Sequence, residues 1–495
     1  MVHARWFLVG VVLLMCARAH AAGPTPVVPD FPVIQSSGIT VNVTPYITAP
    51  ATSGTAPTAR INYANSPQDG SGRVFVNDLN GVISVAGPGG GAASPYLDLR
   101  RLGMNTVPGT PGLSGMAFSP NFGRNPALPG YNTFYTIDYL GAVAADPSIK
   151  TIGKPTGETA ELREWTASDP RASTFSGTSR AVMRVSGYSD GHANGMIAFN
   201  PTAQPGDPDY GNLYVGSGDG HYNDADGNAQ RLDRPQGKML RINPAVGPNG
   251  EPYTVPADNP FLSNAAAVPE IWASGLRFPQ SFTWDKLTGT MYINDLGQQW
   301  IEEVNVGVAG ANYGWGLREG TYATGYAFGH DSSDENIYTP TQSAASLGMT
   351  DPIAEYWHAE GNAIGSGLLY RGTAIPELYG KYLLGDIVVG RVFVFDPGSV
   401  ITGGQAALSE LDFSVNGRSV NLDEVYACCG GRVDLRLSQD ANGEILVAVK
   451  SSGTVYALSE LSIAVPEPST WLLLGAPFAI LSCLNRARRA SITPA

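Results

Sequence analysis

Short runs of β-branched and aromatic residues, each with a turn sequence close by, recur along the chain from about Arg60 onward. Such runs, bounded by Gly, Asn and Asp, are typical of strands and hairpins. Six of them are RVFVNDLNGVISVA from Arg73, NTFYTIDY from Asn132, GNLYVGSGDG from Gly211, GTMYINDLG from Gly289, KYLLGDIVVGRVFVF from Lys381 and GEILVAVKSSGTVYAL from Gly443. Because this part of the sequence has no long stretch with the helical period, the pattern predicts an all-β protein.

The spacing of the six runs favours a six-bladed β-propeller. Their starts lie about 60 to 90 residues apart, which leaves room for a four-stranded sheet and its loops in each unit. A ring of such sheets leaves only short, protected edges. The alternative, a pair of β-sandwiches, would show strands at a more even spacing of about 8–12 residues. We expect the propeller to occupy residues 58–460, after a lead-in over residues 23–57 that contains one strand at Gly38 to Val43. Long inserts such as Tyr322 to Leu347 would lie on one face and shape a site.

Composition supports a folded chain that does not bind nucleic acid. Only 15% of residues are charged and 43% are hydrophobic, so the chain can bury a large core. The formal net charge is −13 and the body contains no basic run, whereas nucleic-acid binding requires concentrated Lys and Arg. The body holds two adjacent cysteines, Cys428 and Cys429, which can form a strained ring or remain reduced thiols.

Residues 1–22 are predicted to be a secretory signal peptide. Arg5 supplies a positive start, the apolar stretch from Trp6 to Cys16 is too short to span a bilayer, and Ala19-His20-Ala21 fits the small-x-small cleavage pattern. The alternative is a buried N-terminal helix.

The C-terminal residues 465–490 are predicted to be a second targeting signal. A Pro-Glu-Pro triplet at Pro466 precedes the apolar stretch from Trp471 to Leu484, and Arg486, Arg488 and Arg489 follow. This order resembles a PEP-CTERM sorting signal of Gram-negative bacteria, which implies an exosortase-type processing enzyme as partner and a transient membrane contact. The alternative is a permanent anchor, for which fourteen apolar residues are short.

The first candidate for chemistry is a histidine–aspartate pair. His192 precedes a Gly-containing turn and an apolar strand, and Asp219 follows the next strand in Gly-Asp-Gly. A carboxylate beside an imidazole orients the ring and keeps it basic. By spacing alone, a satisfied structural histidine remains the competing interpretation.

The second candidate stretch begins at Pro269. It offers Arg277 in a turn, the adjacent acids Glu302 and Glu303, and NYGW from Asn312. One carboxylate together with backbone carbonyls of Gly-rich turns suits Ca²⁺, which takes oxygen ligands in flexible geometry. The same residues could instead cap a loop or be merely solvated.

An ordered series of motifs resembles the glucose/sorbosone dehydrogenase family, which includes soluble quinoprotein sugar dehydrogenases. The likeness extends from about Thr58 to Leu458. In order, the motifs are GLSGMAFSPNF from Gly112, the His192 turn, GSGDG, GNAQRLDRPQGKMLRI, GLRFPQ, DLGQQWIEEVN, ANYGWGLREGT and YGKYLLGDIVVGRVFVF.

The resemblance implies a six-bladed propeller with pyrroloquinoline quinone (PQQ) over its central face and a Ca²⁺ ion acting on the quinone as a Lewis acid. It assigns His192 as general base, Asp219 as the group that orients it, and Arg277 as the cation facing the cofactor. It places the carbonyls of Gly297 and Gln298 at the cofactor's calcium. It also assigns the Glu303 carboxylate and the Tyr313 carbonyl to a calcium site.

The sequence departs from the family pattern at three positions. Thr110 stands where members usually have Glu or Gln. The fifth-blade hairpin Asp386 to Gly390 lacks the cofactor-binding Lys, and the arginines of the last blade are displaced to Arg432 and Arg436. These groups hold the cofactor's carboxylates. Arg391, Arg432 or Arg436 are the candidates to replace them.

The predicted function is oxidation of an aldose or related polyol by an exported quinoprotein. The expected location is the periplasm, outer surface or extracellular matrix of a Gram-negative bacterium. The alternatives are a non-enzymatic propeller that binds carbohydrate or protein in the envelope, and a calcium-dependent hydrolase on the same architecture.

Overall fold

The computed structural model describes residues 24–104, 112–154, 156–189, 192–400, 404–426 and 431–461. The predicted signal peptide and the predicted C-terminal sorting signal lie outside the described residues, and so do Thr110, Cys428 and Cys429. In the described part, no helix is long and apolar enough to cross a membrane.

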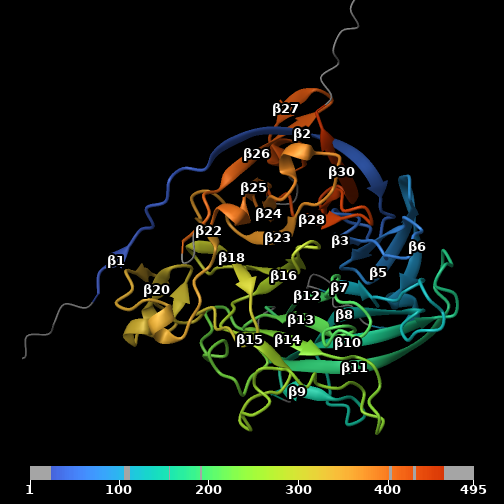
Figure 1. Cartoon of the computed structure of the whole chain (residues 1–495), viewed down its shortest axis with the longest axis horizontal. Coiled ribbons are helices and arrows are strands. Elements are labelled where there is room, and N and C mark those ends of the chain that lie inside the picture. Colours follow the sequence, from blue (N-terminus) through green and yellow to red (C-terminus); the bar gives the residue numbers. More distant parts are fainter. Residues whose placement is uncertain are drawn as a thin grey trace, which may run out of the picture.

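The chain forms a six-bladed β-propeller, as the strand pattern predicted (Figure 1). Each blade is an antiparallel sheet whose first strand lies innermost. The first blade contains β3 (Ile61–Asn65), β4 (Val74–Asp78), β5 (Val82–Gly87) and β6 (Gly90–Asp98). The second contains β7 (Leu113–Phe118), β8 (Thr133–Ala142), β10 (Glu158–Ala167) and β11 (Gly177–Tyr188), and β9 (Thr151–Gly153) extends it. The third contains β12 (Asn194–Phe199), β13 (Leu213–Ser217), β14 (Lys238–Ile242) and β15 (Ile271–Ser274). The fourth blade contains β16 (Pro279–Trp284), β17 (Met291–Asp295), β18 (Ile301–Gly307) and β22 (Ala354–Trp357). The fifth contains β23 (Ile364–Leu369), β24 (Tyr382–Asp386), β25 (Val392–Phe395) and β26 (Ser409–Val415), and β27 (Arg418–Val420) extends it. The sixth contains β28 (Leu435–Gln439), β29 (Ile445–Val449) and β30 (Thr454–Glu460).

The six runs in the sequence correspond to the second strands of the six blades. They contain β4, β8, β13, β17, β24 and β29. A second strand is flanked by neighbours on both sides and covered by the adjacent blades. It is therefore almost entirely buried, as the pattern of β13 and β17 shows, and this burial explains its continuous apolar sequence.

The N-terminal strand β2 (Gln35–Thr48) closes the ring. It pairs antiparallel with β30 of the sixth blade, parallel with β26 of the fifth, and briefly parallel with β6 of the first. It follows the outer edge of these blades as a long arc (Figure 1). The segment assigned to a lead-in by sequence thus contributes a strand to the propeller.

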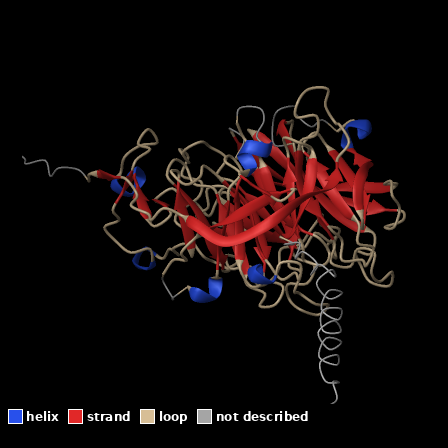
Figure 2. Ribbon diagram, turned by 90° about the horizontal axis from the view of Figure 1, so that it is seen from above, coloured by secondary structure: helices blue, strands red, loops and turns tan. Residues whose placement is uncertain are grey.

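The hydrophobic core is divided among the interfaces between blades. Among the described residues there are six buried clusters, and each joins side chains of two neighbouring blades, including the sixth with the first. The strands form a flat layer with loops and short helices on both faces (Figure 2). This arrangement rules out the paired sandwiches.

The remaining elements are short. They are the 3₁₀ helices η1 (Leu99–Leu102), η2 (Gly325–Phe328), η3 (Ala345–Leu347), η4 (Pro376–Leu378) and η5 (Pro397–Ser399), and the helix α1 (Leu422–Tyr426). The long insert of the fourth blade forms a small separate sheet of β19 (Arg318–Glu319), β20 (Tyr322–Thr324) and β21 (Ile337–Tyr338), joined by β1 (Pro26–Val27) near the N-terminus.

Candidate active site

His192 and Asp219 meet at one face of the ring. His192 lies two residues before β12 and Asp219 two residues after β13. Because Asn194 pairs with Ser217 in this antiparallel hairpin, the two residues come to the same end of the blade. His192 Nδ1 lies 3.0 Å from Oδ1 of Asp219, which is fully buried. This carboxylate accepts a hydrogen bond from Nδ1–H, so Nε2 keeps its lone pair.

The Nε2 edge of His192 faces a guanidinium. The imidazole stacks on Phe278 with ring centroids 5.4 Å apart. Arg277 Nη2 lies 3.5 Å from His192 Nε2. Arg277 stands just before β16, so the inner strands of the third and fourth blades bring the base and the cation together.

Hydrogen bonds and one aromatic ring hold the Arg277 side chain in place. Its Nε donates to Gln298 Oε1 at 2.7 Å, its Nη1 donates to the Gly297 carbonyl at 2.6 Å, and its Cζ lies 5.7 Å from the Trp315 ring centroid. Trp315 Nε1 also donates to Asp219 Oδ2 at 2.8 Å. The backbone amide of Arg277 donates to Asp295, and burial raises the pKa of this carboxyl to about 8. The side chain is thus fixed beside His192 before any ligand binds.

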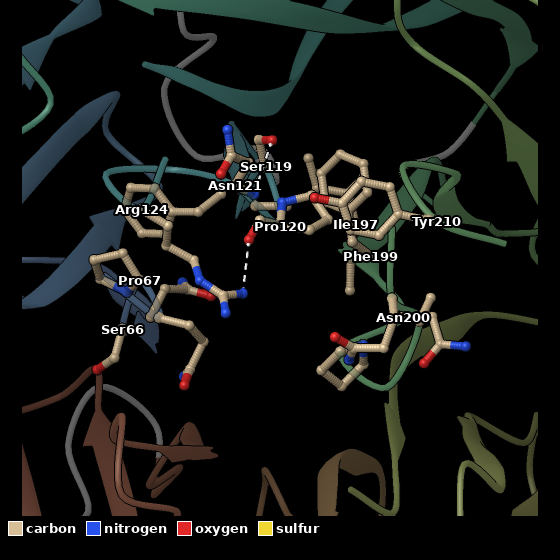
Figure 3. A pocket seen from close by; sticks show the side chains of 18 of the residues that line it. Ser66, Pro67, Ser119, Pro120, Asn121, Arg124, Ile197, Phe199, Asn200 and Tyr210 are labelled. Atoms are coloured by element: carbon tan, nitrogen blue, oxygen red, sulfur yellow. Dashed lines mark hydrogen bonds between the residues drawn. The ribbon is translucent and has the colours of Figure 1, made fainter. Parts of the chain in front are cut away.

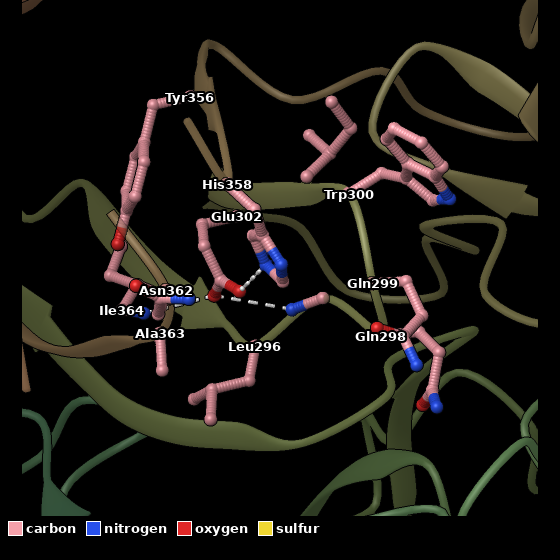
Figure 4. A network of polar contacts seen from close by, with 12 residues as sticks. Leu296, Gln298, Gln299, Trp300, Glu302, Tyr356, His358, Asn362, Ala363 and Ile364 are labelled. Carbon is pink, nitrogen blue, oxygen red and sulfur yellow. Dashed lines mark hydrogen bonds and ion pairs between the residues drawn. The ribbon is translucent and has the colours of Figure 1, made fainter. Parts of the chain in front are cut away.

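Two buried glutamates shape the Gly297–Trp300 turn. Glu319 Oε1 accepts hydrogen bonds from the amides of Gln298, Gln299, Trp300 and Ile301 at 2.7 to 3.0 Å. Glu302 Oε2 accepts from the Gly297 amide, while its Oε1 lies 2.8 Å from His358 Nε2 (Figure 4). The turn therefore has its amides directed inward to carboxylates.

A buried lysine organises the long loop after β13. Lys238 Nζ donates to the carbonyls of Asn228, Ala229 and Gln236 at 2.7 to 2.9 Å. Burial lowers the pKa of this ammonium to about 7. Since Asn228 Nδ2 also donates to the Asp219 carbonyl, the loop fixes the backbone that carries the aspartate.

The small sheet of the fourth-blade insert forms a wall beside this site. Gln298 Nε2 donates to Asn223 Oδ1 at 2.6 Å, and Tyr326 Oη donates to the Asn223 carbonyl at 2.8 Å. Trp300 Nε1 reaches the carbonyl of Glu335. The insert thus lies on the face that carries His192, where the sequence indicated a site-shaping loop.

A family model described as Glucose / Sorbosone dehydrogenase matches residues 67–426. This range covers well over half of the chain. The chain belongs to the glucose/sorbosone dehydrogenase family. The family resemblance found in the sequence is thereby confirmed.

Among curated proteins, the relatives of this chain include plant, bacterial and animal proteins. "HIPL2 protein" of Arabidopsis thaliana is 29% identical over 66% of this chain and 50% of its own length. "Aldose sugar dehydrogenase YliI" of Escherichia coli is 28% identical over 35% of this chain and 44% of its own length. "Hedgehog-interacting protein" of Homo sapiens is 23% identical over 64% and 40%, respectively. The chain thus spans about half the length of the curated relatives it matches, or less.

Solved structures with the same fold include sugar dehydrogenases. One described as "glucose dehydrogenase" has a TM-score of 0.54 and 16% identity, with 87% of this chain and 98% of that chain covered. A calcium structure of a Trichoderma reesei enzyme of Carbohydrate-Active Enzymes Family AA12 has a TM-score of 0.51 and 14% identity, with coverage of 89% and 98%. These likenesses establish the propeller fold.

Of the residues predicted for a calcium site, Glu303 and Tyr313 lie near each other, because burial together with the Glu303 carboxylate raises the pKa of the Tyr313 hydroxyl. Glu303 is buried on β18 and accepts from Asn305 Nδ2 at 3.0 Å, and burial beside Asp295 raises its pKa well above the usual value. The Tyr313 hydroxyl donates to the Val306 carbonyl, and the Gly297 carbonyl accepts from Arg277. Within the described ranges, no group of three or more His, Cys, Asp or Glu residues could hold a metal ion.

Two of the predicted cofactor-binding arginines are engaged in ion pairs. Arg391 lies between Glu360 and Glu410 with nitrogen–oxygen distances of 2.7 Å to each. Arg432 pairs with Asp434 at 2.9 Å. Neither has a contact with His192 or Arg277 in the part of the chain that the structure describes. The sequence could not show this, because the partners of Arg391 come from elsewhere in the fourth and fifth blades.

Arg436 is better placed than Arg432 to bind a cofactor at the axis of the ring. It stands on the inner strand β28, is 9% exposed, and lies 5.9 Å from the Tyr63 ring centroid on the first blade's inner strand. Its Nε has no hydrogen-bond partner among the described residues. Asp434 and Lys450 form an ion pair of 2.6 Å nearby, so this ammonium already has a carboxylate partner. A buried, incompletely paired guanidinium fits an anionic group at the axis.

Other functional residues also escaped sequence reasoning. Glu319, Trp315 and Lys238 hold the turn, the guanidinium and the loop of the site. Glu319 and Trp315 lie in the motif ANYGWGLREGT, and Lys238 in QGKMLRI, so the family resemblance marked their segments but not their roles.

Proposed function

We propose that this chain oxidises an aldose or related polyol and that His192 is its general base. One observation carries the proposal: Asp219 holds His192 Nδ1 so that Nε2 faces Arg277 at 3.5 Å. The membership in the glucose/sorbosone dehydrogenase family supports a sugar-oxidising oxidoreductase.

The residues of the site have distinct roles in this reaction. His192 Nε2 accepts the proton of the hydroxyl on the carbon to be oxidised. Asp219 stabilises the imidazolium that results, as a buried carboxylate bonded to the opposite nitrogen does in other His–Asp pairs. Arg277 stabilises negative charge that develops beside it, and the contacts to Gln298 and Gly297 keep its guanidinium in place.

We propose PQQ with Ca²⁺ as the cofactor. When bound, the quinone supplies a two-electron acceptor, and the calcium ion makes it more electrophilic. Arg277 and Gln298 would contact it on one side of the axis, and Arg436 would hold its carboxylates on the other. The carbonyls of Gly297 and Gln298 are the proposed calcium ligands. Arg391 and Arg432 are not part of this proposal, because their guanidinium groups already have carboxylate partners.

The experiment reconstitutes mature protein with PQQ and Ca²⁺ and measures aldose-dependent dye reduction. His192→Ala should lose at least about 100-fold in kcat, the usual contribution of a general base. His330→Ala is the matched control, since His330 also pairs with an aspartate, Asp334, outside this catalytic set. Equal rates for both variants would remove His192 as the base.

A second candidate function is a non-enzymatic propeller that binds a carbohydrate or protein. The missing fifth-blade lysine and the presence of Hedgehog-interacting protein among the relatives favour it. No change in the quinone spectrum on mixing with protein and Ca²⁺, and no dye reduction with any aldose, would support this alternative.

We also propose that the chain is exported and then released from the membrane by an exosortase-type enzyme. The support is the sequence of residues 1–22 and 465–490. Mass spectrometry of the protein from its native host should find both segments removed. A mature chain that retains the C-terminal arginines would contradict the processing step.

A further inference from the structure

The face of the ring opposite His192 contains a cavity of about 520 Å³. It lies between the ends of the inner strands β3, β7 and β12, near Asn65, Phe118 and Phe199. His192 precedes the other end of β12, so a six-residue strand, about 20 Å at the usual rise, separates the two sites. Ligand pockets commonly have volumes of about 300–1,000 Å³, which makes this cavity large enough for one or two sugar units.

Two loops form fixed walls of the cavity. In the loop after β7, Asn121 Nδ2 donates to the carbonyls of Asn125, Leu128 and Pro129 at 2.9 to 3.1 Å. In the loop after β12, Asn200 Nδ2 donates to Asp209 Oδ2 at 2.8 Å. Because these side chains brace their own loops, the cavity does not need to be ordered by a ligand, which lowers the cost of binding.

The lining combines ring faces with hydrogen-bonding groups. Figure 3 shows Ser66, Pro67 and Arg124 on one side and Phe199, Asn200 and Tyr210 on the other. Phe118 lies at the end of β7 between them. Half-buried aromatic rings next to polar groups suit the apolar C–H face and the polar rim of a sugar ring.

Several polar groups of the lining are not used by the fold. Asn65 Nδ2 and Ser66 Oγ are buried and have no hydrogen-bond partner among the described residues. Buried polar groups in native proteins nearly always have a partner, and these two border the cavity, where a polar ligand or a water molecule would supply one. Arg124 reaches only the Pro120 carbonyl, at 3.3 Å, and has no ion pair with a described carboxylate.

We propose that this cavity binds a neutral sugar unit of a glycan, at a site separate from the oxidation site. The lining has one charged side chain, Arg124, and no carboxylate. A metal ion or a cationic ligand would need carboxylates there, and a phosphorylated ligand would need more than one cation. Amide, hydroxyl and guanidinium groups beside ring faces match the hydroxyls of an uncharged sugar. The site does not depend on the proposed redox activity.

The test applies purified mature protein to an array of neutral oligosaccharides of glucose, galactose, mannose and xylose, followed by calorimetry with the best glycan. We expect binding with one site per chain. Asn65→Leu, which removes the unpaired amide, and Tyr210→Ala, which removes a ring from the wall, should each weaken binding at least 5-fold. Tyr379→Ala, at an exposed tyrosine outside this cavity, is the matched control.

Two further variants separate this site from the oxidation site. Arg277→Ala should keep glycan binding, while Asn65→Leu and Tyr210→Ala should keep the dye-reduction activity of the reconstituted protein. Binding to no glycan on the array would overturn the proposal. It would also be overturned if folded Asn65→Leu and Tyr210→Ala both bound normally, or if Arg277→Ala alone abolished binding.

Discussion

At the scale of single residues, the chemistry depends on which nitrogen of His192 carries a proton. Asp219 is buried and faces Nδ1, while Trp315 Nε1 occupies its other oxygen. The His221 amide also lies 3.4 Å from Oδ1, so Trp315 and the backbone hold the carboxylate in place against the imidazole. The orientation of His192 is fixed by groups from the third and fourth blades.

Asp219→Asn should lower kcat of the reconstituted enzyme by about 100- to 10,000-fold, as loss of the orienting carboxylate does in other His–Asp pairs. The amide can present its NH₂ to Nδ1, which places the proton on Nε2 and removes the base. Circular dichroism and the unfolding midpoint should stay close to those of wild type. A variant with unchanged kcat would show that the pair has only a structural role.

A second residue-scale prediction concerns pH and stability. Asp138 on β8 lies opposite Glu161 on β10, and burial, reinforced by Glu161, raises its pKa from 3.8 to about 7. Since the folded pKa is the higher one, stability is fully present below about pH 4 and is lost as pH rises through about 7. The shift corresponds to at most about 4 kcal/mol.

Asp138→Asn should remove this pH dependence. Urea unfolding at pH 5 and pH 8.5 should show a smaller loss of stability for the variant than for wild type. The exposed Asp423→Asn variant corrects for the change in net charge. Parallel losses in wild type and Asp138→Asn would mean that the carboxyl is ionised in the folded protein across this range.

The sequence predicted a pair of His192 and Asp219 because each stands at a strand end, and the family resemblance added Arg277 to them. It could not predict the pairing of Arg391 with Glu360 and Glu410, which depends on side chains brought together only by the fold. Cofactor contacts inferred from charge type alone are therefore the least predictable part of the site.

At the scale of elements, second strands were readily predicted because burial on both faces gives them continuous apolar sequences. First and outer strands were harder, since half-exposed positions dilute the pattern. The strand β2 was expected in part, at Gly38 to Val43, but its role was not. Pairing between residue 41 and residue 460 is a long-range property that local periodicity does not record.

The closing strand should contribute measurably to stability. Ile47 on β2 is fully buried between the sixth and first blades, whereas its neighbour Thr48 is exposed. Ile47→Ala should lower the free energy of unfolding by about 2–4 kcal/mol through lost burial and a cavity. Thr48→Ala should change it by less than about 0.5 kcal/mol. Equal urea midpoints for the two variants would mean that β2 adds little to the ring.

At the scale of the whole molecule, contacts across the axis supplement those between neighbouring blades. The Tyr63 hydroxyl, on the first blade, lies 3.2 Å from the Gly365 carbonyl of the fifth blade and 3.3 Å from the Gln280 carbonyl of the fourth. With Arg436 over its ring, Tyr63 fills part of the central channel between the oxidation site and the opposite face.

Tyr63→Phe should cost about 1 kcal/mol of stability, the usual net value of one buried hydrogen bond. Tyr46→Phe, which removes a hydroxyl bond to the Pro88 carbonyl at the rim, is the control and should cost less. The difference is measurable in urea unfolding monitored by tryptophan fluorescence. A larger cost at the rim than at the axis would contradict a bracing role for Tyr63.

Because β2 pairs with β30, the propeller cannot close until nearly the whole body of the chain has emerged. A chain that emerges from its N-terminus, at the ribosome or from an export channel, can assemble its first five sheets in order. The pairing of β2 with β30 must wait for residues 454–460, almost the last part of the body to emerge. Until then β2 has no antiparallel neighbour, and two sheet edges stay open to other molecules. We therefore expect misassembly to be easiest in the interval between the emergence of residue 48 and that of residue 460.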